Sequence, residues 1–153
     1  MTDEKTVRGT SFTCFHAGPM EGWAQFHMEP PDVPMPARGK LFLRNFLGSA
    51  GLEMSLNVVP PGKGIPFLHR HQQNDEVYVV VGGRGQFLVD GECIDVAEGS
   101  VLRISPPAAR AWRNNSEAVR ASESRAVSRS FTATLNDLRS MSEPLASSSL
   151  SDT

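Results

Sequence analysis

The sequence predicts an all-β fold built as a single domain. Short apolar runs alternate with turn signals through the middle of the chain, and most of the 13 glycines and 11 prolines fall between those runs. A length of 153 residues suits one domain with one hydrophobic core. About six to eight short strands joined by close turns are typical of an antiparallel barrel or sandwich.

The strongest strand signals lie in residues 38–115. Residues 52–59 begin with apolar and polar residues in alternation, which marks a strand with one buried face. Residues 77–81 are all β-branched or aromatic, as in a strand buried on both faces. Asp90-Gly91 predicts a two-residue hairpin turn. Further strands are expected at 41–46, 86–89, 93–96 and 101–104.

Both flanks differ from this central region. Residues 1–37 form an arm whose Phe12, Phe15, Trp23 and Phe26 are expected to pack on the barrel. In the polar tail, residues 116–153, 11 of 38 residues are serine. Helical spacing of apolar residues from 131 to 138 predicts a short helix over 134–142, and the end of the tail is expected to be disordered.

Composition excludes several functional classes. A net charge of −2 gives no electrostatic basis for binding nucleic acid, and no apolar stretch is long enough for a transmembrane helix. The start of the chain lacks the apolar core of a signal peptide. Cys14 and Cys93 are the only cysteines, which favours reduced thiols in a cytoplasmic protein.

The segment His69-x-His71-x4-Glu76 carries the clearest chemistry. Two histidines two positions apart on a strand share one face, and Glu76 begins the next buried strand. Two imidazoles and one carboxylate suit a divalent transition metal such as iron, manganese, nickel, copper or zinc. Histidine pairs at this spacing are also common as surface or structural residues, so the flanking sequence has to decide.

Residues 64–83 resemble the first motif of the cupin family, in which a glycine and a short spacer precede His-x-His, a glutamate and a second glycine. Four residues separate His71 from Glu76, and six separate Glu76 from Gly83. The resemblance covers roughly residues 40–115. It implies a cupin β-barrel (a double-stranded β-helix, or jelly roll) with a metal site at His69, His71 and Glu76.

The second cupin motif matches less well, because Arg110 stands where the family has its third histidine. A guanidinium cannot bind a metal, and it would repel a divalent ion about 5 Å away by roughly 6 kcal/mol at an effective dielectric near 20. Three roles stay open for Arg110. It pairs with Glu76 in place of a metal, it anchors a carboxylate-bearing substrate beside a three-ligand metal, or it points out of the barrel.

Tyr78 and Trp112 join Arg110 as candidate substrate-binding residues, because they share strand parity with Glu76 and Arg110; both also suit a core role. His16 and His27 are expected to be packing or surface residues unless one completes the site.

The resemblance implies a domain that binds a small anionic molecule in its barrel. One form is a metal-dependent enzyme, such as a dioxygenase, isomerase or decarboxylase. The alternatives are a non-catalytic binding or sensing module without metal, and a largely structural protein. We expect a homodimer that pairs through the N-terminal arm, with no nucleic-acid or membrane partner.

Overall fold

The computed structural model describes residues 5–28, 37–116 and 130–137. The first part of the chain forms β1 (Thr6–Arg8), β2 (Thr13–Phe15), the 3₁₀-helix η2 (Met20–Gln25), β3 (His27–Met28), β4 (Ala37–Arg38), β5 (Lys40–Phe42) and the single-turn helix α1 (Arg44–Leu47). The remaining strands are β6 (Leu52–Val59), β7 (Glu76–Gly82), β8 (Arg84–Val89), β9 (Glu92–Ala97), β10 (Val101–Ile104), β11 (Arg110–Arg113) and β12 (Ser130–Asp137).

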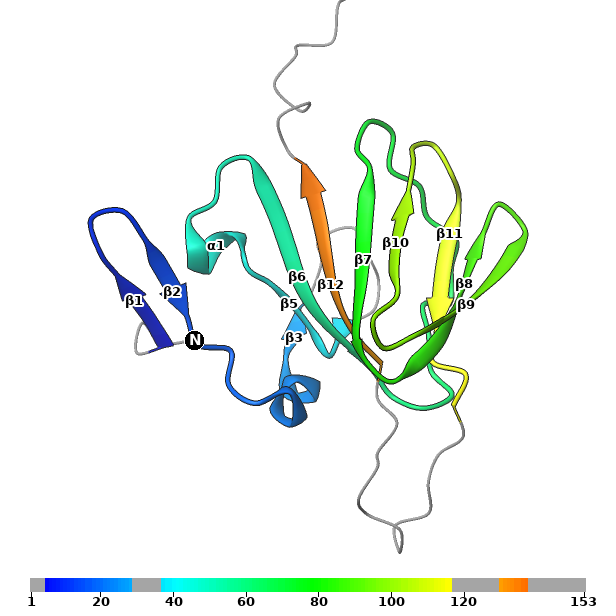
Figure 1. Cartoon of the computed structure of the whole chain (residues 1–153), viewed down its shortest axis with the longest axis horizontal. Coiled ribbons are helices and arrows are strands. Elements are labelled where there is room, and N and C mark those ends of the chain that lie inside the picture. The colour runs from blue at the N-terminus through cyan, green and yellow to red at the C-terminus, as the bar shows by residue number, and fades with distance from the viewer. Residues whose placement is uncertain (1–4, 29–36, 117–129, 138–153) are drawn as a thin grey trace, which may run out of the picture.

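Two antiparallel sheets organise the molecule (Figure 1). The larger sheet has the order β10-β7-β12-β6-β5, and the smaller has the order β11-β8-β9. The chain passes from the first sheet to the second at Gly83, whose φ of +82° suits a tight turn. The all-β prediction is therefore confirmed. The described strands do not form a closed barrel, because no ladder between them joins the two sheets.

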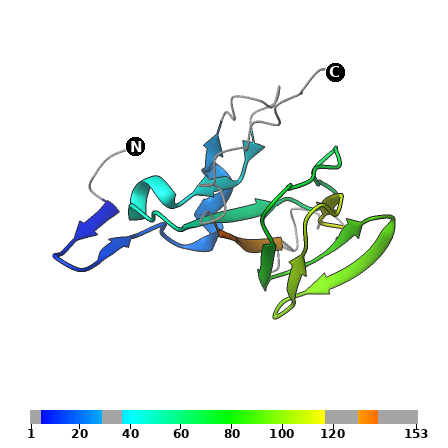
Figure 2. The ribbon, with the colours of Figure 1, turned by 90° about the horizontal axis from the view of Figure 1, so that it is seen from above.

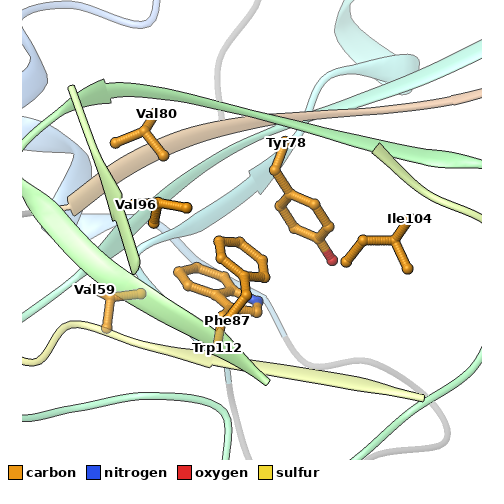
Figure 3. Close-up of a cluster of buried hydrophobic side chains, with 7 residues drawn as sticks. All are labelled: Val59, Tyr78, Val80, Phe87, Val96, Ile104 and Trp112. Carbon is orange, nitrogen blue, oxygen red and sulfur yellow. The ribbon is translucent and has the colours of Figure 1, made fainter. Parts of the chain in front are cut away.

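The main hydrophobic core lies between these sheets (Figure 3). Phe87 and Trp112 from the smaller sheet stack at a centroid distance of 5.9 Å. Tyr78 from the larger sheet meets Phe87 edge-on at 4.7 Å. Val59, Val80, Val96 and Ile104 complete the buried cluster. Burying a large apolar side chain contributes roughly 1.5–3 kcal/mol, so this cluster holds the two sheets together.

A second core covers the outer face of the larger sheet. Phe26 from the arm is buried with Leu41 and Leu43, and Trp23 packs against the same cluster. The hairpin β1–β2 lies farther out, at the opposite end of the molecule from the hairpin β8–β9 (Figures 1 and 2). The arm thus contributes apolar side chains where the strands β5 and β6 turn theirs outward.

The polar tail contributes a strand to the larger sheet. Residues 134–137, where the sequence spacing predicted the start of a helix, belong to β12, so that prediction is wrong there. β12 pairs with β6 on one side and β7 on the other. The edges of β6 and β7 offer hydrogen-bond partners to the backbone on both sides of β12. An isolated turn of helix would leave more of these groups unpaired, so a strand forms instead of a helix. Residues 138–142 and the tail end expected to be disordered lie outside the described residues.

One predicted turn is present in the structure, and one predicted strand is shorter than expected. Asp90 and Gly91 both have positive φ in the turn between β8 and β9, as the hairpin prediction requires. The run at 41–46, in contrast, leaves the sheet after Phe42 and forms the helix α1, which ends at Gly48 with φ +69°. Among the helices of the described residues, none is long and apolar enough to cross a membrane.

Candidate metal and ligand site

The two histidines lie in the connection between β6 and β7. This segment runs antiparallel to β11 and touches it at isolated bridges rather than along a continuous ladder. His69 and Arg110 exchange both backbone hydrogen bonds at 3.0 Å. The sequence prediction of a regular strand at His69 and His71 is therefore wrong, because the connection bends away after each bridge.

Gly64 allows the connection to approach β11 closely. It forms the other bridge, opposite Arg113. A Cβ atom at this position would lie 2.7 Å from the carbonyl oxygen of Trp112, closer than real Cβ contacts allow. The close approach explains why a glycine precedes the histidines, since it brings His69 level with Arg110.

His69, His71 and Glu76 converge as their spacing predicted. One ligand atom from each lies within 4.8 Å of the others. The imidazole centroids are 5.9 Å apart, and Nε2 of His71 is 3.9 Å from Oε2 of Glu76. Glu76 begins β7 opposite Ile104 of β10, and it is only 5% exposed. The donor set fits a divalent ion in number and type.

Arg110 reaches the same point from the other sheet. Its Nε donates to Oε2 of Glu76 at 2.9 Å, and its Nη2 donates to the same oxygen. Nη1 donates to the carbonyl oxygen of Ala108 at 3.3 Å. Arg110 is 1% exposed, so the interpretation that it points out of the barrel is wrong. A buried arginine needs a carboxylate partner, and Glu76 is that partner.

The surroundings of both histidines favour the neutral form that metal binding requires. Burial lowers the pKa of His69, and the positive charge of Arg110 lowers this pKa further. Burial also lowers the pKa of His71, against the opposing charge of Glu76. Nδ1 of His69 is buried and has no hydrogen-bond partner among the described residues. An unsatisfied buried nitrogen beside a second imidazole and a carboxylate fits a metal ligand.

Tyr78 and Trp112, the other candidate substrate-binding residues, occupy different surroundings. Burial raises the pKa of Tyr78 well above its ordinary value, and its interactions with the charge and side chain of Glu76 raise it further. Its phenol therefore stays protonated beside the Glu76–Arg110 pair. Trp112 packs in the core, stacked on Phe87.

His16 and His27 both lie exposed in the arm. Neither belongs to the ligand group that the described residues form around Glu76.

Lys40 is a charged residue near the site that sequence reasoning missed. Burial lowers its pKa, while the charges of Glu76 and Glu53 act in the opposite direction. Lys40 also lowers the pKa of His69 and of His71, although it is the smallest of the causes in each case. The available signal was its place beside two apolar residues, Leu41 and Phe42, in a short run that the sequence already marked as a strand.

Comparison with known proteins identifies the fold family. The family model described as "Cupin domain" matches residues 55–122. This match contains the whole His-x-His-x4-Glu segment and Arg110. No curated protein matches the chain.

Solved structures give the same result. A cupin protein from Bacteroides fragilis shares 26% identity, with 85% of this chain and 97% of that chain covered and a TM-score of 0.57. A putative sugar phosphate isomerase from Acidithiobacillus ferrooxidans shares 17% identity over 64% of this chain and 57% of its own, with a TM-score of 0.52. A cupin domain from Schizosaccharomyces pombe shares 10% identity over 67% of this chain and 65% of its own, also at 0.52. Residues 55–122 therefore match the cupin domain, and the fold of the chain is that of the cupin superfamily.

Proposed function

We propose that this cupin binds a divalent transition metal at His69, His71 and Glu76, together with a small anionic molecule. The observation that carries the proposal is the convergence of these three side chains, together with a buried Nδ1 of His69 that has no hydrogen-bond partner among the described residues. Metal-binding histidines are neutral, and the lowered pKa of each histidine supports that state.

Arg110 gives the site its preference for anions. Two of its donations go to one oxygen of Glu76, Oε2, so in this proposal the other oxygen, Oε1, is the one that would bind the metal. Carboxylates that bind metals are commonly oriented by such a hydrogen bond. The guanidinium also adds a positive charge that weakens binding of the cation alone. An anionic ligand offsets this repulsion, so metal and anion are expected to strengthen each other's binding.

The enzymatic form of this proposal is a dioxygenase-type or isomerase-type reaction on the bound anion. A divalent metal at this point would supply a Lewis acid that polarises an oxygen of the ligand. The chain's own residues orient Glu76 through Arg110 and keep a protonated phenol, Tyr78, beside that pair. The similarity to a putative sugar phosphate isomerase shows that this fold also occurs in a protein given that name. The substrate of the present protein remains part of the proposal.

Calorimetric titration with Zn²⁺, with and without oxalate, tests the proposal. The wild type should bind one zinc per chain, more tightly when oxalate is present. His69→Ala and His71→Ala should each lose at least tenfold in zinc affinity, whereas His27→Ala, which changes an exposed histidine, should not. Arg110→Met should bind zinc more tightly without oxalate and gain less from adding it. Equal zinc affinity in His69→Ala and His27→Ala would contradict the metal site.

A metal-free binding module is a second candidate, favoured by the Arg110–Glu76 pair itself. In this form the buried ion pair replaces the metal, and the protein binds its anion through the remaining polar groups. Oxalate binding that is independent of zinc and unchanged in His69→Ala would support it. We further propose a cytoplasmic location, because Cys14 and Cys93 are both free and exposed.

A further inference from the structure

The inner face of the larger sheet carries a row of polar residues beyond the metal ligands. Ser55 and Asn57 alternate on β6 with Leu56, which packs in the outer core, so both point to the inner side. Each is 2% exposed, and Nδ2 of Asn57 donates to Oγ of Ser55 at 3.1 Å. Buried polar residues at core positions reduce apolar packing, so a ligand-facing role explains them better than stability does.

Lys40 lies on the same inner face. The register of β5 and β6 places Lys40 directly opposite Asn57, while its neighbour Leu41 is buried in the outer core. Residues directly opposite each other in an antiparallel pair share one side of the sheet. Nζ of Lys40 lies 4.8 Å from the ring centre of Phe42, the next inward residue of β5. Phe42 pairs with Ser55, so the ammonium leans along the strand toward Ser55.

The sheet register connects this position to the metal ligands. β12 lies between β6 and β7 and places Ser55 level with Tyr78, while Tyr78 stands two residues from Glu76 on the same face. The charge of Glu76 is the largest influence that opposes the effect of burial on Lys40. The register places Lys40 itself level with Val80, four residues along β7 from Glu76 and on the same inner face.

The ammonium of Lys40 has no carboxylate within 4.0 Å in the part of the chain that the structure describes. The nearest acid inside the site, Glu76, is already held by two donations from Arg110. The charge of Glu53 raises the pKa of Lys40 less than the charge of Glu76 does. Oε1 of Glu53 also accepts a hydrogen bond from the backbone amide of Arg44 at 3.3 Å. A partly buried ammonium without an ion-pair partner is unfavourable unless an anionic ligand completes it.

We propose that Lys40 binds a second anionic group of the ligand, a carboxylate or a phosphate, at the end farthest from His69, His71 and Glu76. This inference rests on the proposed function, because it assumes that the near end of the ligand lies at those three residues. Ser55 lies between the two ends and Asn57 lies beside Lys40, and both suit hydroxyl groups on the ligand. The ligand class is then a small hydroxylated acid with anionic groups at both ends.

Two matched pairs of acids test the proposal. 2-Hydroxyglutarate differs from lactate by a chain that ends in a second carboxylate, and 3-phosphoglycerate differs from glycerate by a terminal phosphate. Calorimetry with and without Zn²⁺ should show the wild type binding each doubly anionic acid about tenfold or more tightly than its partner. The better of the two acids identifies the terminal group as carboxylate or phosphate.

Lys40→Met should remove that preference while leaving lactate and glycerate affinities within about twofold, and Lys40→Arg should keep it. Lys63→Met is the matched control, because Lys63 is exposed. Thermal melting should show that Lys40→Met folds, since the change removes a desolvated charge. A wild type without preference for the doubly anionic acids, or a preference that survives in Lys40→Met, contradicts the role of Lys40.

Zinc titration without any acid separates this proposal from the metal site. Equal zinc affinity of wild type and Lys40→Met, with no preference between the acids, contradicts Lys40 and leaves the metal site standing. Absence of zinc binding contradicts the metal site. In that case the acids are compared in zinc-free protein. A preference for the doubly anionic acids that Lys40→Met removes would still support the proposed role of Lys40.

Discussion

Arg110 donates from both Nε and Nη2 to a single oxygen of Glu76, across the two sheets of the fold. Both residues are almost fully buried. A buried charge without its partner is far more costly than the pair, so each residue depends on the other. This mutual dependence makes the pair the structural centre of the site.

Glu76→Gln should destabilise the protein by about 3–5 kcal/mol, because it leaves a buried guanidinium without a charged partner. Urea unfolding followed by fluorescence measures the change in the free energy of unfolding. The double variant Glu76→Leu with Arg110→Met should recover most of this loss, since apolar replacements remove both buried charges. A loss below about 1 kcal/mol for Glu76→Gln would show that water reaches the pair.

Acidification should destabilise the metal-free protein through the two histidines. The pKa of each is lowered below its ordinary value near 6.5 in the folded state, so the unfolded chain binds more protons. The resulting contribution to stability is fully present above pH about 6.5 and is lost as pH falls through the lower folded-state values.

Unfolding free energies measured between pH 8 and pH 5 check this dependence. The double variant His69→Gln and His71→Gln should lose less stability over that range than the wild type, because it has lost the two titrating groups. His16→Gln, which changes an exposed histidine of the arm, serves as the control. If the unfolding free energies of the wild type and the double variant fell equally with pH, the two histidines would not be the cause of the acid destabilisation.

Phe26→Ala should cost about 3–5 kcal/mol, because Phe26 is 6% exposed and anchors the arm to Leu41 and Leu43. Deleting residues 143–153 should leave the melting temperature nearly unchanged, as their serine-rich composition predicts. Calorimetric melting compares the two variants directly. Similar losses from both would mean that the end of the tail also completes the core.

We propose that the protein forms a homodimer through the hairpin β1–β2. The hairpin projects from the end of the molecule (Figure 1), and it exposes two large apolar side chains, Phe12 at 60% and Val7 at 50%. Light scattering at micromolar concentration should give the mass of two chains, and Phe12→Asp should shift it toward one chain. A single-chain mass for the wild type would rule the dimer out.

Much of the fold follows from local sequence patterns. The strands at 52–59 and 101–104 have the predicted bounds, because alternating apolar residues and flanking turn residues act over short distances. The apolar spacing at 131–138 predicted a helix, and residues 130–137 form the strand β12 instead. Their pairing with β6 and β7, which are distant in sequence, decides the outcome.

In the candidate site, too, some residues could be predicted from local sequence patterns and others could not. The spacing of His69, His71 and Glu76, together with the resemblance to the cupin motif, predicted that they lie close together, since a short connection limits where they can lie. The role of Arg110 could only be narrowed to three alternatives, because it depends on how the two sheets face each other. Lys40 escaped notice because its inward direction follows from its register with Asn57, which no local pattern encodes.

Anomalous diffraction at the zinc edge, from crystals grown with Zn²⁺ and oxalate, tests the central claim most directly. We expect one peak per chain about 2.0–2.2 Å from a nitrogen of His69, a nitrogen of His71 and an oxygen of Glu76, with Arg110 still bound to the other carboxylate oxygen. No peak at this point, with the side chains of Arg110 and Glu76 filling it, would contradict the metal site.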